Sequence, residues 1–211
     1  MLSLRRYYLD KLLFQNIHFI KGKVIDAGGN KQVKRGYFDA SEVNANITYL
    51  NIDPTTNPDI LGNVDNIPCD DSSFDCLLAT ELLEYTKEPK IVLREFYRIL
   101  NNDSFVLLSI PFLHPIHSDF QFDRIRFTRL YIEEISKQVG FEVISTEAMG
   151  SVGGVIFDIL KVTFGYASKN RFRNIYSVIL SLFRPFFLFL DRITKNQSDY
   201  INTGYFVILR K

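Results

Sequence analysis

Two short apolar runs of this chain have an aspartate close to their carboxyl end, which is the position where a parallel sheet binds a ligand. The run at residues 23–27 contains Asp26 and leads into a glycine-rich turn, and the run at residues 47–52 leads into Asp53. The carboxyl ends of parallel strands meet at one edge of a sheet, so we expect both carboxylates there. A turn without Cβ atoms admits a ligand close to the backbone, and a carboxylate can accept both hydroxyl protons of a ribose. The spacing predicts a pocket for an adenosine-containing cofactor.

The turn itself narrows the choice of cofactor. A nicotinamide-dinucleotide fold places glycine at the first, third and sixth positions of this turn, where the chain has Gly28, Asn30 and Val33. The Gly-Lys-Ser/Thr signature of a phosphate-binding loop is absent from the sequence. An adenosine cofactor without a pyrophosphate remains, and S-adenosylmethionine is that cofactor.

The composition indicates a folded chain that has no general electrostatic attraction for polyanions. A length of 211 residues with 46% hydrophobic residues favours one domain spanning residues 1–211. A net charge of +1 gives no general attraction for nucleic acid, so no nucleic-acid partner is expected. Cys69 and Cys76 lack the spacing of a disulfide framework or a zinc site, so we expect free thiols and no metal. These features, with no signal peptide recognisable before Asp10 and Lys11, predict a cytoplasmic protein.

Alternating apolar patterns predict an α/β architecture. Strands are expected at residues 23–27, 47–52, 60–64, 74–79, 104–110, 141–146 and 205–209. Helical spacing occurs at residues 4–19, 89–100 and 128–139. This order is typical of a mostly parallel sheet with helices on both faces, with the N-terminal helix (residues 1–20) packed on the sheet. The linker at residues 31–46 lacks a helical period, so a short or irregular helix is expected there.

Residues 150–203 interrupt this order with an apolar helical insertion before the last strand. Its most apolar part, residues 175–190, is too short to span a bilayer and contains Arg184-Pro185. Two interpretations remain open. The insertion is a helix pair that covers the sheet or a partner in a homodimer, or residues 170–194 contact the inner face of a membrane peripherally. The arginines that would rim this membrane element are Arg171, Arg173, Arg184 and Arg192.

The order of these motifs resembles that of class I S-adenosylmethionine-dependent methyltransferases. Residues 24–30 resemble the first motif of that family, Asp53 its ribose-binding acid and residues 62–68 its adenine loop. Residues 73–85 resemble the fourth-strand motif, and residues 93–100 the helix that follows it. The likeness covers residues 21–149 and returns at residues 204–210. It implies a Rossmann-like methyltransferase fold, a mostly parallel seven-stranded sheet with an antiparallel last strand.

The resemblance also implies a set of cofactor-binding residues. The methionine end of S-adenosylmethionine would lie on Asp26, Ala27, Gly28, Gly29 and Asn30, and Ala79, Thr80 and Glu81 would complete that end. Asp53 and Pro54 would hold the ribose, and Asn63 and Val64 the adenine. The chain departs from the family at Asn30 and Gln32, where glycine is common, at Asn63, where aspartate is usual, and at Tyr85, where histidine is common.

A second group of polar residues follows the fifth predicted strand. Residues 111–128 resemble the corresponding segment in a bacterial subgroup of these methyltransferases that is associated with surface-polysaccharide or glycolipid pathways. This resemblance implies a small-molecule, glycan or glycolipid acceptor. Methyl transfer to a hydroxyl needs a base, and His117 is the candidate, oriented by Asp119 or Asp123. Arg126 would bind an anionic acceptor group or pair with Asp123.

Each of these residues also has a purely structural interpretation. His117 can cap the loop, Asp123 and Arg126 can form a structural ion pair, and Thr128 can cap the next helix. Tyr85 is a candidate hydrogen-bond donor to the acceptor or a packed aromatic residue, and His114 a part of the loop geometry. An alternative function follows: a catalytically weak or inactive methyltransferase-fold protein that binds a membrane or a protein.

Overall fold

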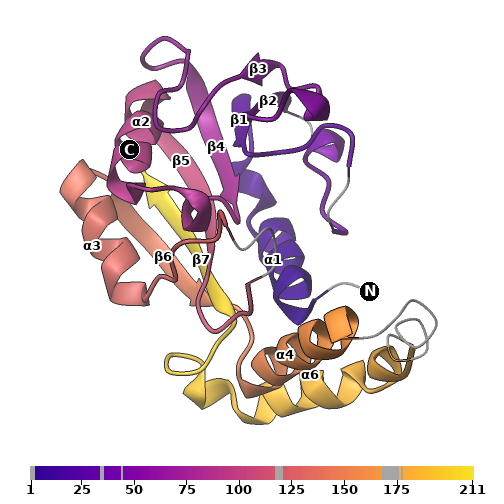
Figure 1. The fold of residues 1–211 in the computed structure, drawn as a ribbon. Helices are drawn as coiled ribbons and strands as arrows, with labels where there is room; N and C mark the ends of the chain where they lie inside the picture. The colour runs from indigo at the N-terminus through magenta and orange to yellow at the C-terminus, as the bar shows by residue number, and fades with distance from the viewer. Residues whose placement is uncertain (1–2, 34–35, 44, 117–120, 168–175, 177) are drawn as a thin grey trace.

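A seven-stranded sheet forms the centre of the computed structural model, which describes residues 3–211 except 34–35, 44, 117–120, 168–175 and 177 (Figure 1). The strands are β1 (Lys23–Ala27), β2 (Asn46–Asn51), β3 (Ile60–Leu61), β4 (Phe74–Thr80), β5 (Leu100–Pro111), β6 (Glu142–Ala148) and β7 (Gly204–Arg210). Their order is β3-β2-β1-β4-β5-β7-β6. The pairs among β1 to β5 are parallel, whereas β7 runs antiparallel to both β5 and β6. The predicted fold class is confirmed.

The central strands are apolar on both sides because both faces of the sheet are covered. In β4, Leu77 and Ala79 face one core cluster, and Cys76 and Leu78 face the other. Such a two-sided strand has a continuous apolar sequence rather than an alternating one. The carboxyl end of β4 is thereby held rigidly between two cores, and it is where the predicted site begins.

Helices cover the two faces in the way that their apolar spacing predicts (Figure 1). The described helices are α1 (Leu4–Gln15), α2 (Pro89–Ile99), α3 (Arg129–Val139), α4 (Val152–Ala167) and α6 (Arg184–Ile193). α1 packs Leu9 and Leu13 on one face, and α2 and α3 pack Phe96 and Ile132 on the other. Thr128 caps α3, since its Oγ1 accepts a hydrogen bond from the Tyr131 N–H at 3.3 Å.

Several boundaries differ from the expected ones. β3 ends at Leu61 rather than residue 64, because the chain turns at Asn63 and the N–H of Asn66 donates to its carbonyl. β5 spans Leu100–Pro111 rather than residues 104–110. Between β1 and β2 the described residues contain only a short 3-10 helix, η2 (Ala40–Glu42), which agrees with the missing helical period.

The insertion before β7 is a helix pair that packs on α1 rather than over the sheet. α4 contacts α6 and α1, and Leu4 joins Phe157 and Phe187 in a separate core cluster. Pro185 lies in the first turn of α6, where a missing N–H breaks no helical hydrogen bond, so Arg184-Pro185 starts a helix in the middle of the apolar run. Among the described helices, none has the length and apolarity needed to span a membrane.

Candidate functional site

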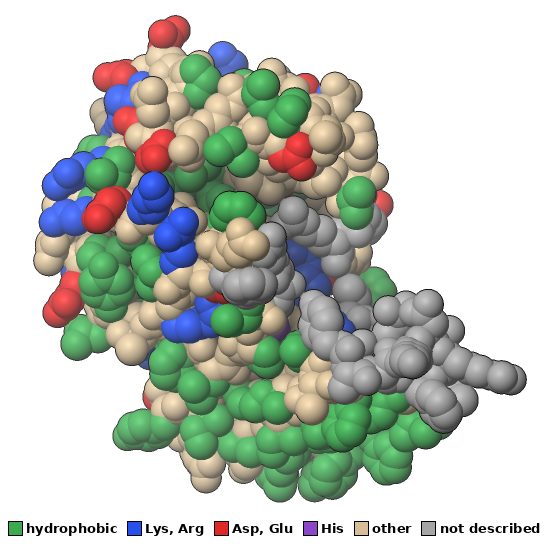
Figure 2. Space-filling view, in the orientation of Figure 1, with side chains coloured by type: hydrophobic (Ala, Val, Ile, Leu, Met, Phe, Trp, Pro, Cys, Tyr) green, Lys and Arg blue, Asp and Glu red, His purple; other side chains and the backbone are tan. Residues whose placement is uncertain are grey.

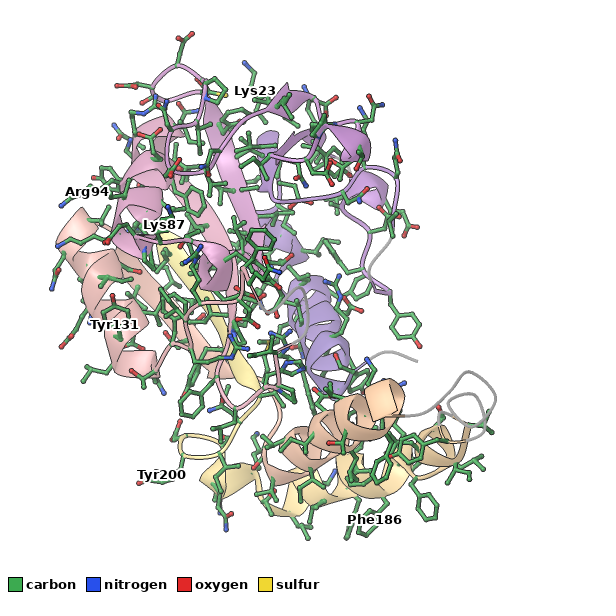
Figure 3. All side chains as sticks on the ribbon, in the orientation of Figure 1. Lys23, Lys87, Arg94, Tyr131, Phe186 and Tyr200 are labelled. Carbon is green, nitrogen blue, oxygen red and sulfur yellow. The ribbon has the colours of Figure 1, made fainter. Side chains whose placement is uncertain are left out.

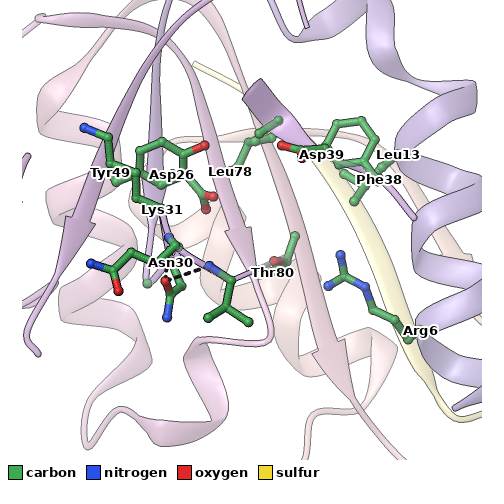
Figure 4. Close-up of a pocket in the computed structure, with 15 residues that line it drawn as sticks. Arg6, Leu13, Asp26, Asn30, Lys31, Phe38, Asp39, Tyr49, Leu78 and Thr80 are labelled. Atoms are coloured by element: carbon green, nitrogen blue, oxygen red, sulfur yellow. Dashed lines mark hydrogen bonds between the residues drawn. The ribbon is translucent and has the colours of Figure 1, made fainter. Parts of the chain in front are cut away.

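A cavity of about 220 Å³ opens at the carboxyl ends of β1 and β4, on the face that α1 covers (Figure 4). Five residues predicted to bind the cofactor line it: Asp26, Gly28, Gly29, Asn30 and Thr80. The opposite wall comes from α1 and from residues 38–40 of the linker. Arg6, Leu13, Phe38, Asp39, Tyr49 and Leu78 also line the cavity.

The glycine turn at this cavity is held by specific contacts. Gly28 adopts φ +77°, a left-handed conformation that favours glycine, and its N–H donates to the Leu50 carbonyl at 2.8 Å. A Cβ on Gly29 would collide with the Asp26 carboxylate. Asn30 accepts hydrogen bonds from the N–H groups of Gln32 at 2.9 Å and Val33 at 3.1 Å. The amide side chain thus organises the loop at a position where the family commonly has glycine.

Side chains of both charges line the cavity, with Asp26 in β1 and Arg6 and Asp39 on the opposite wall. Asp26 and Asp39 lie near Tyr49, and burial, followed by the charge of these carboxylates, raises the pKa of that tyrosine. Arg6 approaches from α1, with its Nε 2.8 Å from Asp10 Oδ1 (Figure 4). The arrangement suits a small zwitterion, whose cationic and anionic ends need partners on opposite sides.

The residues predicted to hold the ribose and adenine lie outside this cavity. Asp53 is exposed, and its Oδ1 accepts hydrogen bonds from the Thr55 N–H at 2.9 Å and Oγ1 at 2.7 Å. These bonds lower the pKa of Asp53. Pro54 begins the 3-10 helix η3 (Pro54–Thr56), and Val64 packs against the core while Asn63 forms the turn after β3. The cavity therefore accounts for one end of the predicted cofactor site.

Of the remaining predicted cofactor residues, Ala27 is buried at the end of β1, and Ala79 and Glu81 flank Thr80. Ala79 is buried in β4, whereas Glu81 adopts φ +57° just after the strand. The Glu81 N–H donates to Ser109 Oγ at 3.1 Å, and Ser109 Oγ donates to Glu81 Oε1 at 2.8 Å. The Glu81 carboxylate also forms an ion pair with Arg5 of α1. The end of β4 is therefore tied to the N-terminal helix.

Arg5 is the centre of a buried charged cluster beside the cavity. It is 5% exposed, and burial lowers its pKa to about 10 although Glu84 and Asp158 act in the opposite direction. Glu84, in the 3-10 helix η4 (Leu83–Tyr85), is fully buried, and burial raises its pKa to about 7. Burial likewise raises the pKa of Asp158.

The loop after β5 brings Asp123 and Arg126, two of the predicted catalytic residues, to this cluster. Arg126 Nη2 donates to Asp123 Oδ2 at 2.8 Å, the ion pair of the structural interpretation, which raises the pKa of Arg126. The electrostatic influence of Glu84 and Tyr85 also reaches Arg126. The N–H groups of Arg124 and Ile125 donate to the Glu84 carbonyl at 2.8 and 3.2 Å, which anchors the loop. His117 and Asp119 lie outside the described residues.

His114 joins the loop to α4. Its Nδ1 lies 2.8 Å from the Pro115 carbonyl, and its Nε2 lies 3.6 Å from Asp158 Oδ2. The Pro115 carbonyl is an acceptor, so this contact requires a proton on Nδ1, while Nε2 faces the Asp158 carboxylate beyond hydrogen-bond distance. We therefore interpret His114 as a structural link rather than a base.

Sequence reasoning missed Arg5, Arg6, Glu84 and Asp158. Arg5 and Arg6 belong to no recognisable motif in the sequence. Asp158 carries a usable signal, since it is one of two acids in the strongly apolar residues 152–193, and a lone acid in such a helix is typically buried with a partner. Within the described residues, no group of His, Cys, Asp or Glu forms a candidate metal site.

A family model described as a methyltransferase domain matches residues 31–108, which run from the linker after the glycine turn to β5. The chain has no significant match among curated proteins.

Solved structures are similar over nearly the whole chain. A SAM-dependent methyltransferase from Archaeoglobus fulgidus is similar with a TM-score of 0.61 and 11% identity, over 98% of this chain and 94% of that chain. The 1,6-didemethyltoxoflavin-N1-methyltransferase of Burkholderia thailandensis, solved with S-adenosylhomocysteine, is similar with a TM-score of 0.57 and 13% identity. The similarity covers 99% of this chain and 78% of that chain. The [4+2]-cyclase SpnF is similar with a TM-score of 0.62 and 15% identity, over 96% of this chain and 81% of that chain. Since SpnF is a cyclase, this fold is not confined to methyl transfer. The chain therefore has the fold of class I S-adenosylmethionine-dependent methyltransferases, and the matched methyltransferase domain supports S-adenosylmethionine as the cofactor.

Proposed function

We propose that this protein transfers a methyl group from S-adenosylmethionine to a hydroxyl group of a small-molecule or glycan acceptor. The observation that carries the proposal is the cavity beside the glycine turn, with Asp26 and Arg6 on different walls. The amino acid end of S-adenosylmethionine is a zwitterion, so its ammonium and carboxylate groups match these two side chains. The Gly29 position fits as well, because a Cβ there would occupy the space of the Asp26 carboxylate.

The rest of the cofactor would extend past the turn toward Asp53. The exposed carboxylate of Asp53 has a lowered pKa, so it is ionised at neutral pH and able to accept both ribose hydroxyl protons. Asn63 and Val64 would contact the adenine. When bound, S-adenosylmethionine supplies an electrophilic methyl group on a sulfonium.

The acceptor would lie on the side of Thr80 that faces the charged cluster. His117 belongs to the same loop as Asp123 and Arg126, so we assign it the role of taking the hydroxyl proton near neutral pH. Since Arg126 engages Asp123, Asp119 is the better candidate to orient His117. Tyr85 would donate a hydrogen bond to the acceptor. A hydroxyl-rich acceptor suits this polar wall, and the resemblance of residues 111–128 supports a glycan or glycolipid.

Isothermal titration calorimetry tests the cofactor half of the proposal. We expect S-adenosylmethionine and S-adenosylhomocysteine to bind, and Asp53→Asn to weaken binding about tenfold or more, because an amide offers one acceptor where the carboxylate offers two. Asn at this position can still accept the Thr55 hydrogen bonds, so the turn is preserved. Asp199→Asn, at another exposed acid, is the control and should bind normally. Absence of binding heat with both compounds would refute the proposal.

A labelled-methyl assay tests the base. S-adenosylmethionine carrying a tritiated methyl group is incubated with glycans and glycolipids extracted from bacterial cell envelopes, and alkali-stable label is counted as methyl ether. His117→Gln should lower incorporation about 100-fold or more while cofactor affinity stays unchanged, whereas His18→Gln should have no effect. Undiminished incorporation by His117→Gln would exclude its role as the base, and alkali-labile label would exclude a hydroxyl acceptor.

A further inference from the structure

A broad apolar face covers the outer side of the helix pair (Figure 2). We define this apolar face by Ile156 and Ile159 of α4, Leu182, and Phe186, Phe189 and Ile193 of α6. These side chains are between 39% and 74% exposed. Phe186 points away from the rest of the molecule (Figure 3). Monomeric soluble proteins rarely expose so many large apolar side chains together, so the face is expected to have a partner.

The spacing shows that this face is separate from the packing face of α6. Leu182, Phe186, Phe189 and Ile193 follow one another at intervals of three or four residues, which places them on one side of the helical segment. Phe187 and Asp191 are buried on the other side. The exposed residues are therefore not needed to hold the helix pair on α1.

Within residues 152–197, the exposed charges that the structure describes have a single sign. Residues 152–197 contain two acids, and both Asp158 and Asp191 are buried. Asp191 is fully engaged: it accepts hydrogen bonds from Tyr8 Oη at 2.7 Å and from the N–H groups of Ser151 and Gly154, each at 2.9 Å. Of the bases that the structure describes in this segment, Arg192 and Lys195 are exposed, Arg184 is half-buried over the Tyr7 ring, and Lys161 is mostly buried beside Asp158 and Arg5. The charge that this segment offers to a partner is therefore positive.

We propose that the α4–α6 apolar face docks on the surface of an anionic lipid bilayer. Apolar side chains flanked by Lys and Arg, without exposed acids, are the features of a helix that lies in the interfacial plane of a membrane with negatively charged headgroups. With 16 residues in α4 and 10 in α6, the helices are shorter than the roughly 20 residues that span a bilayer. Docking parallel to the surface is therefore the geometry that fits. The proposal stands independently of the methyl transfer reaction.

Docking in this way would hold the candidate site close to the bilayer. On α4, Asp158 lies about 200° around the helix from Ile156. Asp158 therefore faces the charged cluster, and Ile156 faces away from it. A helix with its side chains is about 10–12 Å across. The charged cluster would thus lie on the order of one helix diameter above the lipid surface.

Vesicle flotation of the full-length protein tests the proposal. We expect the protein to float with vesicles of phosphatidylcholine mixed with phosphatidylglycerol, to bind pure phosphatidylcholine vesicles less, and to be released by added salt. The double variant Phe186→Glu/Phe189→Glu should reduce the partition coefficient about tenfold or more. Leu130→Glu on α3 is the matched control, since Leu130 is 65% exposed on another helix, and it should bind as the unchanged protein does.

Three results would overturn docking: no flotation of the unchanged protein with the anionic vesicles, an equal loss in Leu130→Glu, or unreduced flotation of the double variant. Light scattering after gel filtration provides the competing outcome. A dimer that the double variant converts to a monomer, without vesicle binding, would show that a second copy covers the face. The circular dichroism spectrum of the double variant should match that of the unchanged protein, which would show that the variant is folded. This control does not depend on S-adenosylmethionine binding.

Discussion

Glu84 is a buried acid whose ionisation depends strongly on its surroundings. Its carboxyl group has a pKa of about 7 in the folded protein because of burial, against 4.5 for an unperturbed group. Between these two values the unfolded chain releases a proton that the folded chain retains. The free energy of unfolding therefore falls as the pH rises from about 5 to about 7.

Glu84→Gln should remove this contribution. We expect the unfolding free energy of the variant to fall less between pH 5 and pH 8 than that of the unchanged protein, by on the order of 2 kcal/mol. Urea unfolding at the two pH values measures the difference. Identical pH dependence in the two proteins would show that Glu84 does not titrate in this range.

Single residues of the site differ in how far the sequence predicts them. Gly28 and Asp26 are recognisable because their roles depend on the backbone of one turn and on the strand before it. The role of Asn30 is also local, since the N–H groups that donate to its side chain lie two and three residues ahead, and asparagine is known to form such turns. The ion pair between Glu81 and Arg5 joins residues far apart in the chain, and neither residue type specifies the other.

At the scale of elements, the start of α1 depends on a residue of α4. Asp158 accepts hydrogen bonds from the backbone N–H groups of Leu4 at 2.8 Å and Arg5 at 3.0 Å, all in a buried environment. The negative charge of this carboxylate also favours the charged form of Arg5, so it acts to raise the pKa of Arg5. One side chain thereby satisfies the end of a helix and joins the insertion to the site.

Asp158→Ala should consequently destabilise the protein by about 3 kcal/mol or more, because two buried N–H groups and a buried guanidinium lose a partner. Asp158→Asn retains acceptor capacity and should cost less. Asp199→Ala, which removes an exposed acid, should change stability by less than about 0.5 kcal/mol. Urea denaturation measures all three, and a loss of under about 1 kcal/mol in Asp158→Ala would contradict this role.

The elements also show what periodicity can predict. The strands and helices of the sheet region follow from apolar spacing, and Pro185 marks a helix start that reads as an interruption in the sequence alone. The side on which the helix pair packs was not predictable, because nearly all residues in 175–190 are apolar and no stripe distinguishes an inner from an outer face. The packing of Phe157 and Phe187 with Leu4 decides it.

For the molecule as a whole, the site is an assembly of distant segments. The cavity is formed by the ends of β1 and β4, by the linker before β2 and by α1, while the charged cluster adds the loop after β5 and α4. The sheet order places these segments at one edge. The apolar face lies on the far side of the same helix pair, so a docked molecule would present this edge near the surface.

Local patterns in the sequence are sufficient to predict the fold class and the position of the glycine turn, Asp26 and Thr80 at the sheet edge. Strand alternation, glycine requirements and motif order are properties of short stretches of chain, so they can be recognised without the fold. Packing between distant segments sets Arg6 opposite Asp26 across the cavity, brings Arg5 and Asp158 to Glu84 in a buried cluster, and places the insertion on α1. These contacts depend on burial and on charge pairing between segments up to 183 residues apart, and no local pattern encodes such pairing.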